Sequence, residues 1–138
     1  MSESSSGARK LDRETLSKID VYLEQMYESG KTEETGREIS STGAKNTQIR
    51  GLETLVVSTN RFSEIINYIK NQAGKDRKGQ WTKFGPRLLE QLDEIENVSR
   101  KMSDGDPAKR LDIKLRIARG WIRQVVASYL YSESIGSH

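Results

Sequence analysis

The sequence predicts an all-α protein, a small bundle of four to five helices with a mobile N-terminal extension. Apolar residues recur at three- and four-residue steps through most of the chain, which is the pattern of helices with one buried face. Residues that start and stop helices border these stretches, and no stretch alternates as a strand does. The 138 residues, 33% hydrophobic and 31% charged, are enough for one domain with one modest core under a charged surface.

The first 44 residues are predicted to stand apart from the bundle. Residues 1–10 are rich in serine and are expected to form a disordered tail. A helix is predicted over residues 12–28, and residues 30–44 are expected to be a mobile linker, because the only apolar side chains there are Ile39 and Ala44. The chain therefore divides into the tail, an N-terminal helix and linker over residues 11–44, and a bundle domain over residues 45–138.

The bundle begins with residues 46–73, which carry a long apolar stripe. Good N-capping residues open this stretch and Gly74 closes it. Residues 58–60 have poor helix propensity, so the stretch is either one long helix or two. On one continuous helix, two arginines, a valine and a tyrosine would lie in one narrow sector on the side away from the core. A valine and a tyrosine between arginines indicate a surface that binds a partner. These residues are Arg50, Val57, Arg61 and Tyr68.

Two further helices are predicted over residues 86–102 and 106–132. Pro86 suits the first position of one, whose exposed side is acidic; Asp106 followed by Pro107 is a capping sequence for the other. The last helix has two apolar stripes, so it is central in the bundle or shared with another subunit. Between the stripes lies a basic ridge of Lys109, Arg116, Arg119 and Arg123.

The residue content argues against catalysis and against a membrane span. There is no cysteine, the single histidine is His138, and no glycine-rich phosphate loop is present. Histidine- or cysteine-based catalysis and a structural zinc site are therefore not expected, nor is any cofactor. No apolar run approaches the roughly 20 residues that a membrane span requires, and the N-terminus has no hydrophobic segment, so a cytoplasmic protein without a membrane partner is expected.

Charge is distributed unevenly along the chain. Residues 1–44 hold 6 Lys and Arg against 9 Asp and Glu, a net charge of −3, whereas residues 45–138 hold 17 against 11, a net charge of +6. A basic body favours an anionic partner such as RNA, although the same side chains could be solvated or paired with the acidic residues at 90–96. The aromatic rings of Trp81, Phe84 and Trp121 are either core residues or platforms for stacked bases. The candidate RNA-binding residues are Arg50, Arg61, Lys75, Arg77, Lys78, Lys83, Arg87, Arg116, Arg119 and Arg123.

Three motifs in order carry a family resemblance over about residues 45–131. The Thr47-Gln48-Ile49-Arg50 helix start is similar to the T-x-Q-I-R start of the first long helix in the Csm-type small subunit of type III CRISPR effector complexes. The segment KFGPRLL at residues 83–89 resembles the family's K-P-K-L second helix, and VVASYLY at residues 125–131 is similar to its closing motif. The Lys-rich helix end common in that family is missing, since Ser132, Glu133 and Ser134 follow.

The resemblance implies a non-enzymatic subunit of a ribonucleoprotein used in antiviral defence. Copies of the protein would stack with one another and with other subunits, and would contact the backbones of guide RNA and target RNA. Arg50 and Arg87 are assigned by their motif positions, whereas the ridge arginines are proposed on their spacing alone. The alternative is a helical protein–protein adaptor that binds no nucleic acid.

Overall fold

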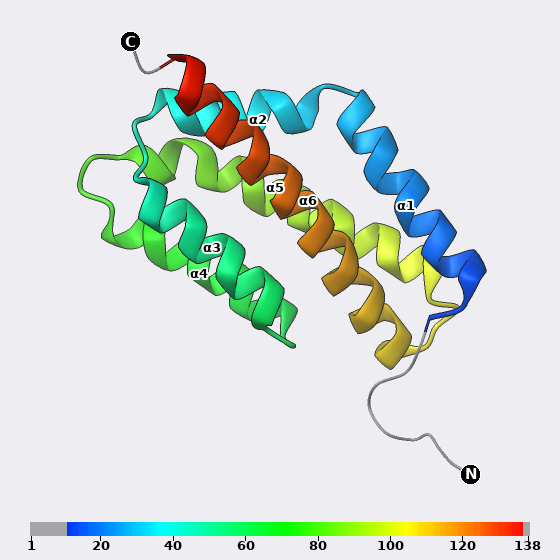
Figure 1. The fold of residues 1–138 in the computed structure, drawn as a ribbon. Coiled ribbons are helices and arrows are strands. Elements are labelled where there is room, and N and C mark those ends of the chain that lie inside the picture. The colour runs from blue at the N-terminus through cyan, green and yellow to red at the C-terminus, as the bar shows by residue number, and fades with distance from the viewer. Residues whose placement is uncertain (1–10, 137–138) are drawn as a thin grey trace.

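The computed structural model describes residues 11–136, which form six α-helices with no strand among them (Figure 1). The predicted all-α class is confirmed, with more helices than expected; the tail predicted over residues 1–10 lies outside the described residues. Within residues 11–136, no helix is both long and apolar enough to cross a membrane. The helices are α1 (Arg13–Glu28), α2 (Lys31–Ser41), α3 (Asn46–Ser58), α4 (Phe62–Lys75), α5 (Gln80–Met102) and α6 (Pro107–Gly136).

Helix α6 is the centre of the bundle and packs against all five other helices. Helices α1 and α2 lie on one side of it, the α3–α4 pair lies on the other, and α5 runs behind (Figure 1). Both predicted apolar stripes are used, because residues from each, such as Ile122 and Ile117, are fully buried. The two-stripe pattern is thus explained within a single chain. Asp106 caps α6 as predicted, accepting hydrogen bonds from the amides of Ala108 at 3.0 Å and Lys109 at 3.3 Å.

The prediction that residues 30–44 form a mobile linker is wrong, because this segment contains helix α2. Gly36 allows the α2 backbone to approach α6 closely: a Cβ atom there would lie 2.6 Å from Ser128 Cβ and 2.7 Å from the backbone nitrogen of Tyr129. The sequence pattern missed α2 because it was searched for large apolar residues at helical spacing, whereas α2 is buried mainly through glycine and threonine. The buried residues of α2 are Thr32, Thr35, Gly36 and Ile39.

Residues 46–73 form two antiparallel helices joined at residues 59–61 (Figure 1). The Tyr68 hydroxyl donates a hydrogen bond to the Gln48 carbonyl at 3.0 Å and thereby ties α4 to the start of α3. Gly51 makes room for it, since a Cβ atom there would lie 2.7 Å from the Tyr68 hydroxyl oxygen. The chain reversal separates Arg50 from Arg61, so the narrow sector expected on a continuous helix does not form.

Helix α5 begins at Gln80, six residues earlier than predicted. The Asp76 carboxylate accepts a hydrogen bond from the Trp81 amide, and Trp81 and Phe84 are fully buried, so both capping and packing hold the added turns. Pro86 therefore lies inside the helix and not at its first position, where it was expected. Its missing N–H leaves the Thr82 carbonyl without a helical partner; both residues are exposed, so water can replace that bond.

We expect Gly36→Ala to destabilise the protein by about 1–3 kcal/mol, because the new methyl group overpacks the α2–α6 contact. Gly74→Ala is the matched control. Nothing lies within 4 Å of a Cβ atom at Gly74, which is helical, so alanine there should stabilise by about 0.5–1 kcal/mol. Urea unfolding followed by circular dichroism measures both changes. A Gly36→Ala protein as stable as the parent would contradict the close approach of α2 to α6.

Candidate nucleic-acid interface

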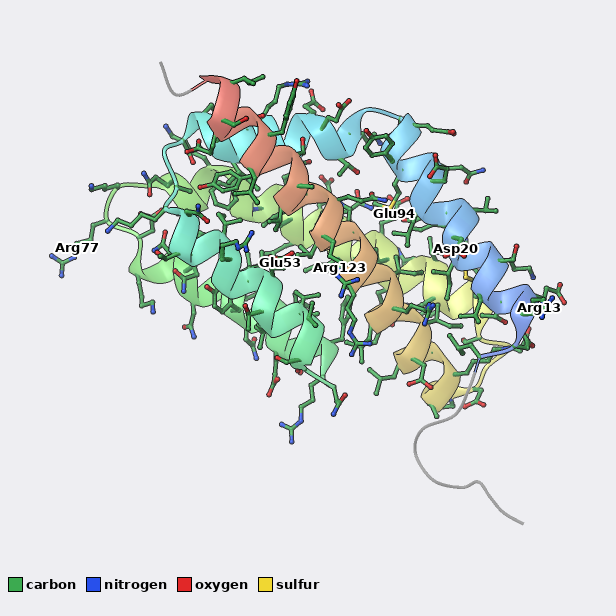
Figure 2. All side chains as sticks on the ribbon, in the orientation of Figure 1. Arg13, Asp20, Glu53, Arg77, Glu94 and Arg123 are labelled. Carbon is green, nitrogen blue, oxygen red and sulfur yellow. The ribbon has the colours of Figure 1, made fainter. Side chains whose placement is uncertain are left out.

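The fold separates acidic and basic surfaces on the two sides of α6. Residues 45–79, which form α3, α4 and the following loop, hold 7 Lys and Arg against 3 Asp and Glu, a net charge of +4. Residues 11–44, which form α1 and α2, hold 4 against 8, a net charge of −4. Figure 2 shows Arg77 projecting from the loop at the end of the α3–α4 pair, and Asp20 on α1 across α6 from it. An anionic partner is attracted to the first surface and repelled by the second.

The end of α4 and the loop that follows it present the densest group of free cations. Lys75, Arg77 and Lys78 are exposed, and none of them forms an ion pair within residues 11–136. Asp76 does not neutralise them, because its carboxylate accepts hydrogen bonds from the backbone amides of Lys78, at 3.1 Å, and Trp81. The predicted cation Lys83 is also exposed and without an ion pair among the described residues.

The two arginines of the α3–α4 pair are exposed but lie at different places. The Nε atom of Arg50 is 3.8 Å from a carboxylate oxygen of Glu53, a solvent-exposed pair that leaves most of the guanidinium accessible. Arg61 stands at the connection between the helices, at the N-cap position of α4, and forms no ion pair in the described part of the chain. The structure thus places both at the surface without bringing them together.

Arg119 of the predicted ridge is engaged by the protein itself. Its Nε atom donates to the Val56 carbonyl at 3.2 Å and its Nη2 atom donates to the Thr59 carbonyl at 3.0 Å. These carbonyls lie at the C-terminal end of α3, which has no basic residue in its own last turn. A cation there satisfies unpaired carbonyls and the negative end of the helix dipole. Arg119 therefore fastens α3 to α6.

Arg116 and Arg123 are the ridge residues that remain accessible. Both are exposed, and neither forms an ion pair with a carboxylate among residues 11–136. They are two turns apart, about 10 Å along the axis, on one side of α6. Figure 2 shows Arg123 on the part of α6 that faces the same side of the molecule as α3. These two side chains are free to bind an external anion.

Arg87, a candidate assigned by motif position, joins α5 to α2. Its Nε atom lies 2.8 Å from a Glu38 carboxylate oxygen, and its Nη1 atom lies 3.3 Å from one of Glu34. Two carboxylates therefore face one guanidinium, and the local charge is negative. This geometry gives Arg87 a role in holding α2 in place.

The sequence also allowed the basic residues of α6 to pair with the acidic residues at 90–96 of α5. Such pairs do form, but they involve Lys114 and Arg110 and not the arginines of the predicted ridge. Lys114 Nζ lies 2.5 Å from one carboxylate oxygen of Glu96, and Arg110 Nε lies 3.8 Å from the other. Burial alone would raise the pKa of Glu96; the hydrogen bond and charge of Lys114, with the charges of Arg100 and Arg110, outweigh it and lower the pKa. Glu96 thus links α5 to α6 and leaves Arg116 and Arg123 unpaired.

The three aromatic rings considered as stacking platforms are core residues, with Trp81 and Phe84 fully buried and Trp121 only 2% exposed. The Trp81 indole N–H donates to Gln48 Oε1 at 3.1 Å, and Ile49 is also buried. Two residues of the Thr47-Gln48-Ile49-Arg50 motif therefore serve the packing of α3 against α4 and α5. Arg50 is the motif residue with a charged group at the surface.

Within residues 11–136, no group of three or more His, Cys, Asp or Glu side chains is placed to hold a metal ion. Comparison with protein-family models, with curated proteins and with solved structures finds no match to this chain.

Arg119→Met should destabilise the protein by about 1–3 kcal/mol, because it leaves the α3 carbonyls without a charged donor. Arg123→Met is the matched control on the same helix and should change stability by less than about 0.5 kcal/mol, since its guanidinium has no protein partner among the described residues. Thermal unfolding of the two variants makes the comparison. Equal stabilities would show that Arg119 does not cap α3.

Glu96→Gln should destabilise the protein at pH 7 by about 1–3 kcal/mol, because three cations lose their carboxylate. A lowered folded-state pKa means that the stabilisation is present above the ordinary value of 4.5 and disappears as pH falls through the folded value. The gap between parent and variant should therefore close in strong acid. Urea unfolding at a series of decreasing pH values from 7 tests this, with the exposed Asp93→Asn variant as control; a gap that does not narrow as the pH falls counts against the charge-based account.

Proposed function

We propose that this protein is a non-enzymatic RNA-binding subunit of a type III CRISPR ribonucleoprotein effector complex. It acts in the cytoplasm and contacts the phosphates of target RNA or guide RNA. The observation that carries the proposal is the set of exposed cations in the loop after α4 and on α6 that form no ion pair among the described residues. The similarity of the helix-start motif at residues 47–50 to the Csm-type small subunit supports the proposed kind of complex.

The chemistry of this surface suits the RNA backbone better than the bases. Lysine and arginine side chains bind phosphate oxygens by charge and by hydrogen bonds, and such contacts position a strand without reading its sequence. The buried aromatic rings supply no platform on which bases could stack. Base pairing between guide and target would then supply all sequence recognition, and this subunit would hold the strands.

Stacking of like copies is the second part of the proposal. The α1–α2 side has a net charge of −4 and the α3–α4 side with its loop has a net charge of +4. An acidic side placed against the basic side of the next copy gives favourable electrostatics in a head-to-tail array. Such an array would extend a line of phosphate-binding cations from one copy to the next.

A fourfold charge-removal variant tests RNA binding. Arg77, Lys78, Arg116 and Arg123 are changed together to Gln, and Arg119 is kept because it caps α3. If all four contact phosphates, the slope of log affinity against log salt concentration should flatten by about three units for single-stranded RNA. Fluorescence anisotropy with unstructured oligoribonucleotides of several sequences measures the slope, which should be the same for each.

The matched control removes four positive charges from the other side of α6, at Arg13, Lys18, Lys31 and Arg37. Its net charge equals that of the test variant, so any difference between them reports position and not overall charge. If both variants lose affinity equally, or if neither does, the proposed RNA surface is incorrect. In the second case the protein–protein adaptor becomes the better interpretation.

A further inference from the structure

A small cavity lies where α1, α2, α5 and α6 meet, on the acidic side of the molecule. Its volume is about 200 Å³. Met26 and the buried Trp121 give it an apolar part, Tyr22 and Thr32 form its walls, and Lys31 and Glu94 lie at its exposed edge. At roughly 30 Å³ per water molecule, the space corresponds to six or seven waters, so it fits a small metabolite.

The α2 residues that line the cavity carry hydrogen-bond donors that the protein does not use. Thr32 is only 1% exposed, and its hydroxyl has no hydrogen-bond partner among the described residues. The backbone amides of Thr32 and Glu33 also have no acceptor there, because the N-cap residue Gly30 supplies no side chain. Lys31 adds an ammonium group without an ion pair in the described part of the chain. A buried, unpartnered hydroxyl is costly unless something binds it, and these groups together suit a carboxylate.

Glu94 of α5 adds a free negative charge to the lining of the cavity. Glu94 is exposed and forms no ion pair within residues 11–136. Burial and the charge of Glu94 raise the pKa of Tyr22 to about 12, so the phenol keeps its proton at neutral pH. The Tyr22 oxygen already accepts a hydrogen bond from Gln91 Nε2 at 3.5 Å, so its O–H remains available as a donor. A carboxylate without a cation beside it suits an ammonium group.

We propose that this cavity binds a small zwitterion with a primary ammonium and a carboxylate group, the chemical class of the free α-amino acids. The ligand carboxylate binds Lys31 and Thr32, its ammonium binds Glu94, and its side chain packs on Met26 and Trp121. This site is separate from the basic surface. It is built largely by α1 and α2, which lie outside the region of family resemblance.

The two tryptophans provide a probe and a control within one sample. The indole N–H of Trp121 reports on the cavity, whereas that of Trp81 is bonded to Gln48 in the core beside α3 and α4. Nitrogen-15 NMR spectra of the full chain are recorded while each common amino acid is added singly. At least one amino acid should shift the Trp121 indole signal in a saturable way and leave the Trp81 signal in place. Acetate or ethylammonium chloride alone should bind far more weakly, since each offers one charge.

Three variants and one control locate the groups of the bound ligand. Glu94→Gln and Lys31→Gln should each weaken binding by roughly tenfold or more, and the neighbouring Asp93→Asn should leave it unchanged. Thr32→Val should weaken binding but raise the melting temperature, because it removes an unpartnered buried hydroxyl. A purely structural role for Thr32 would not give that combination.

Several results would overturn the proposal. These are the absence of any selective shift of the Trp121 signal, equal shifts of both indole signals, and binding unchanged in the Glu94 and Lys31 variants. The proposal would also be contradicted if acetate bound as tightly as the amino acids, because the site would then recognise the carboxylate alone.

Discussion

The two-sided burial of α6 is the constraint on which the rest of the structure depends. A helix with apolar residues on two sides must be covered on both, and α1–α2 and α3–α4 do so while α5 packs behind. The specific polar contacts of the fold reach α6 as well. Tyr129 donates a hydrogen bond to the Ala44 carbonyl at 3.0 Å, Arg119 caps α3, and the Gly36 backbone packs on Ser128. Helices α2 and α3 and the loop between them are thereby fixed against α6 at defined places.

This arrangement also decides the electrostatics of the surface. The chain places its acidic residues early and its basic residues later, and α6 then lies between the two groups. A modest net charge of +3 becomes one acidic side and one basic side. Such a separation favours an anionic ligand on one side and a complementary protein surface on the other. Glu94 and Lys31 both line a cavity on the acidic side of the molecule.

The cations of the protein fall into two groups that differ in their partners. Arg119 bonds backbone carbonyls, Arg87 faces two carboxylates, and Lys114 pairs with Glu96 while lying 4.8 Å from the centre of the Phe62 ring. Arg77 and Arg123 have no carboxylate partner among the described residues. The order of charges along the chain cannot distinguish paired from unpaired cations, because the partner of a cation depends on which helix lies opposite it in the fold. Geometry therefore narrows the candidate RNA-binding set to the cations that remain accessible.

The sequence by itself determined the all-α class, the capped start of α6 at Asp106, and the two apolar stripes that require α6 to be covered on two sides. These properties follow from periodicity and local hydrogen bonding, which act over a few residues. Tertiary structure alone decided that residues 31–41 are a helix, that α5 starts at Gln80, and that Arg119 is a cap. Those outcomes depend on contacts across the fold: the close approach at Gly36, the burial of Trp81, and the end of α3 beside α6. Local propensity carries no information about such partners, because they come together only when the chain is packed.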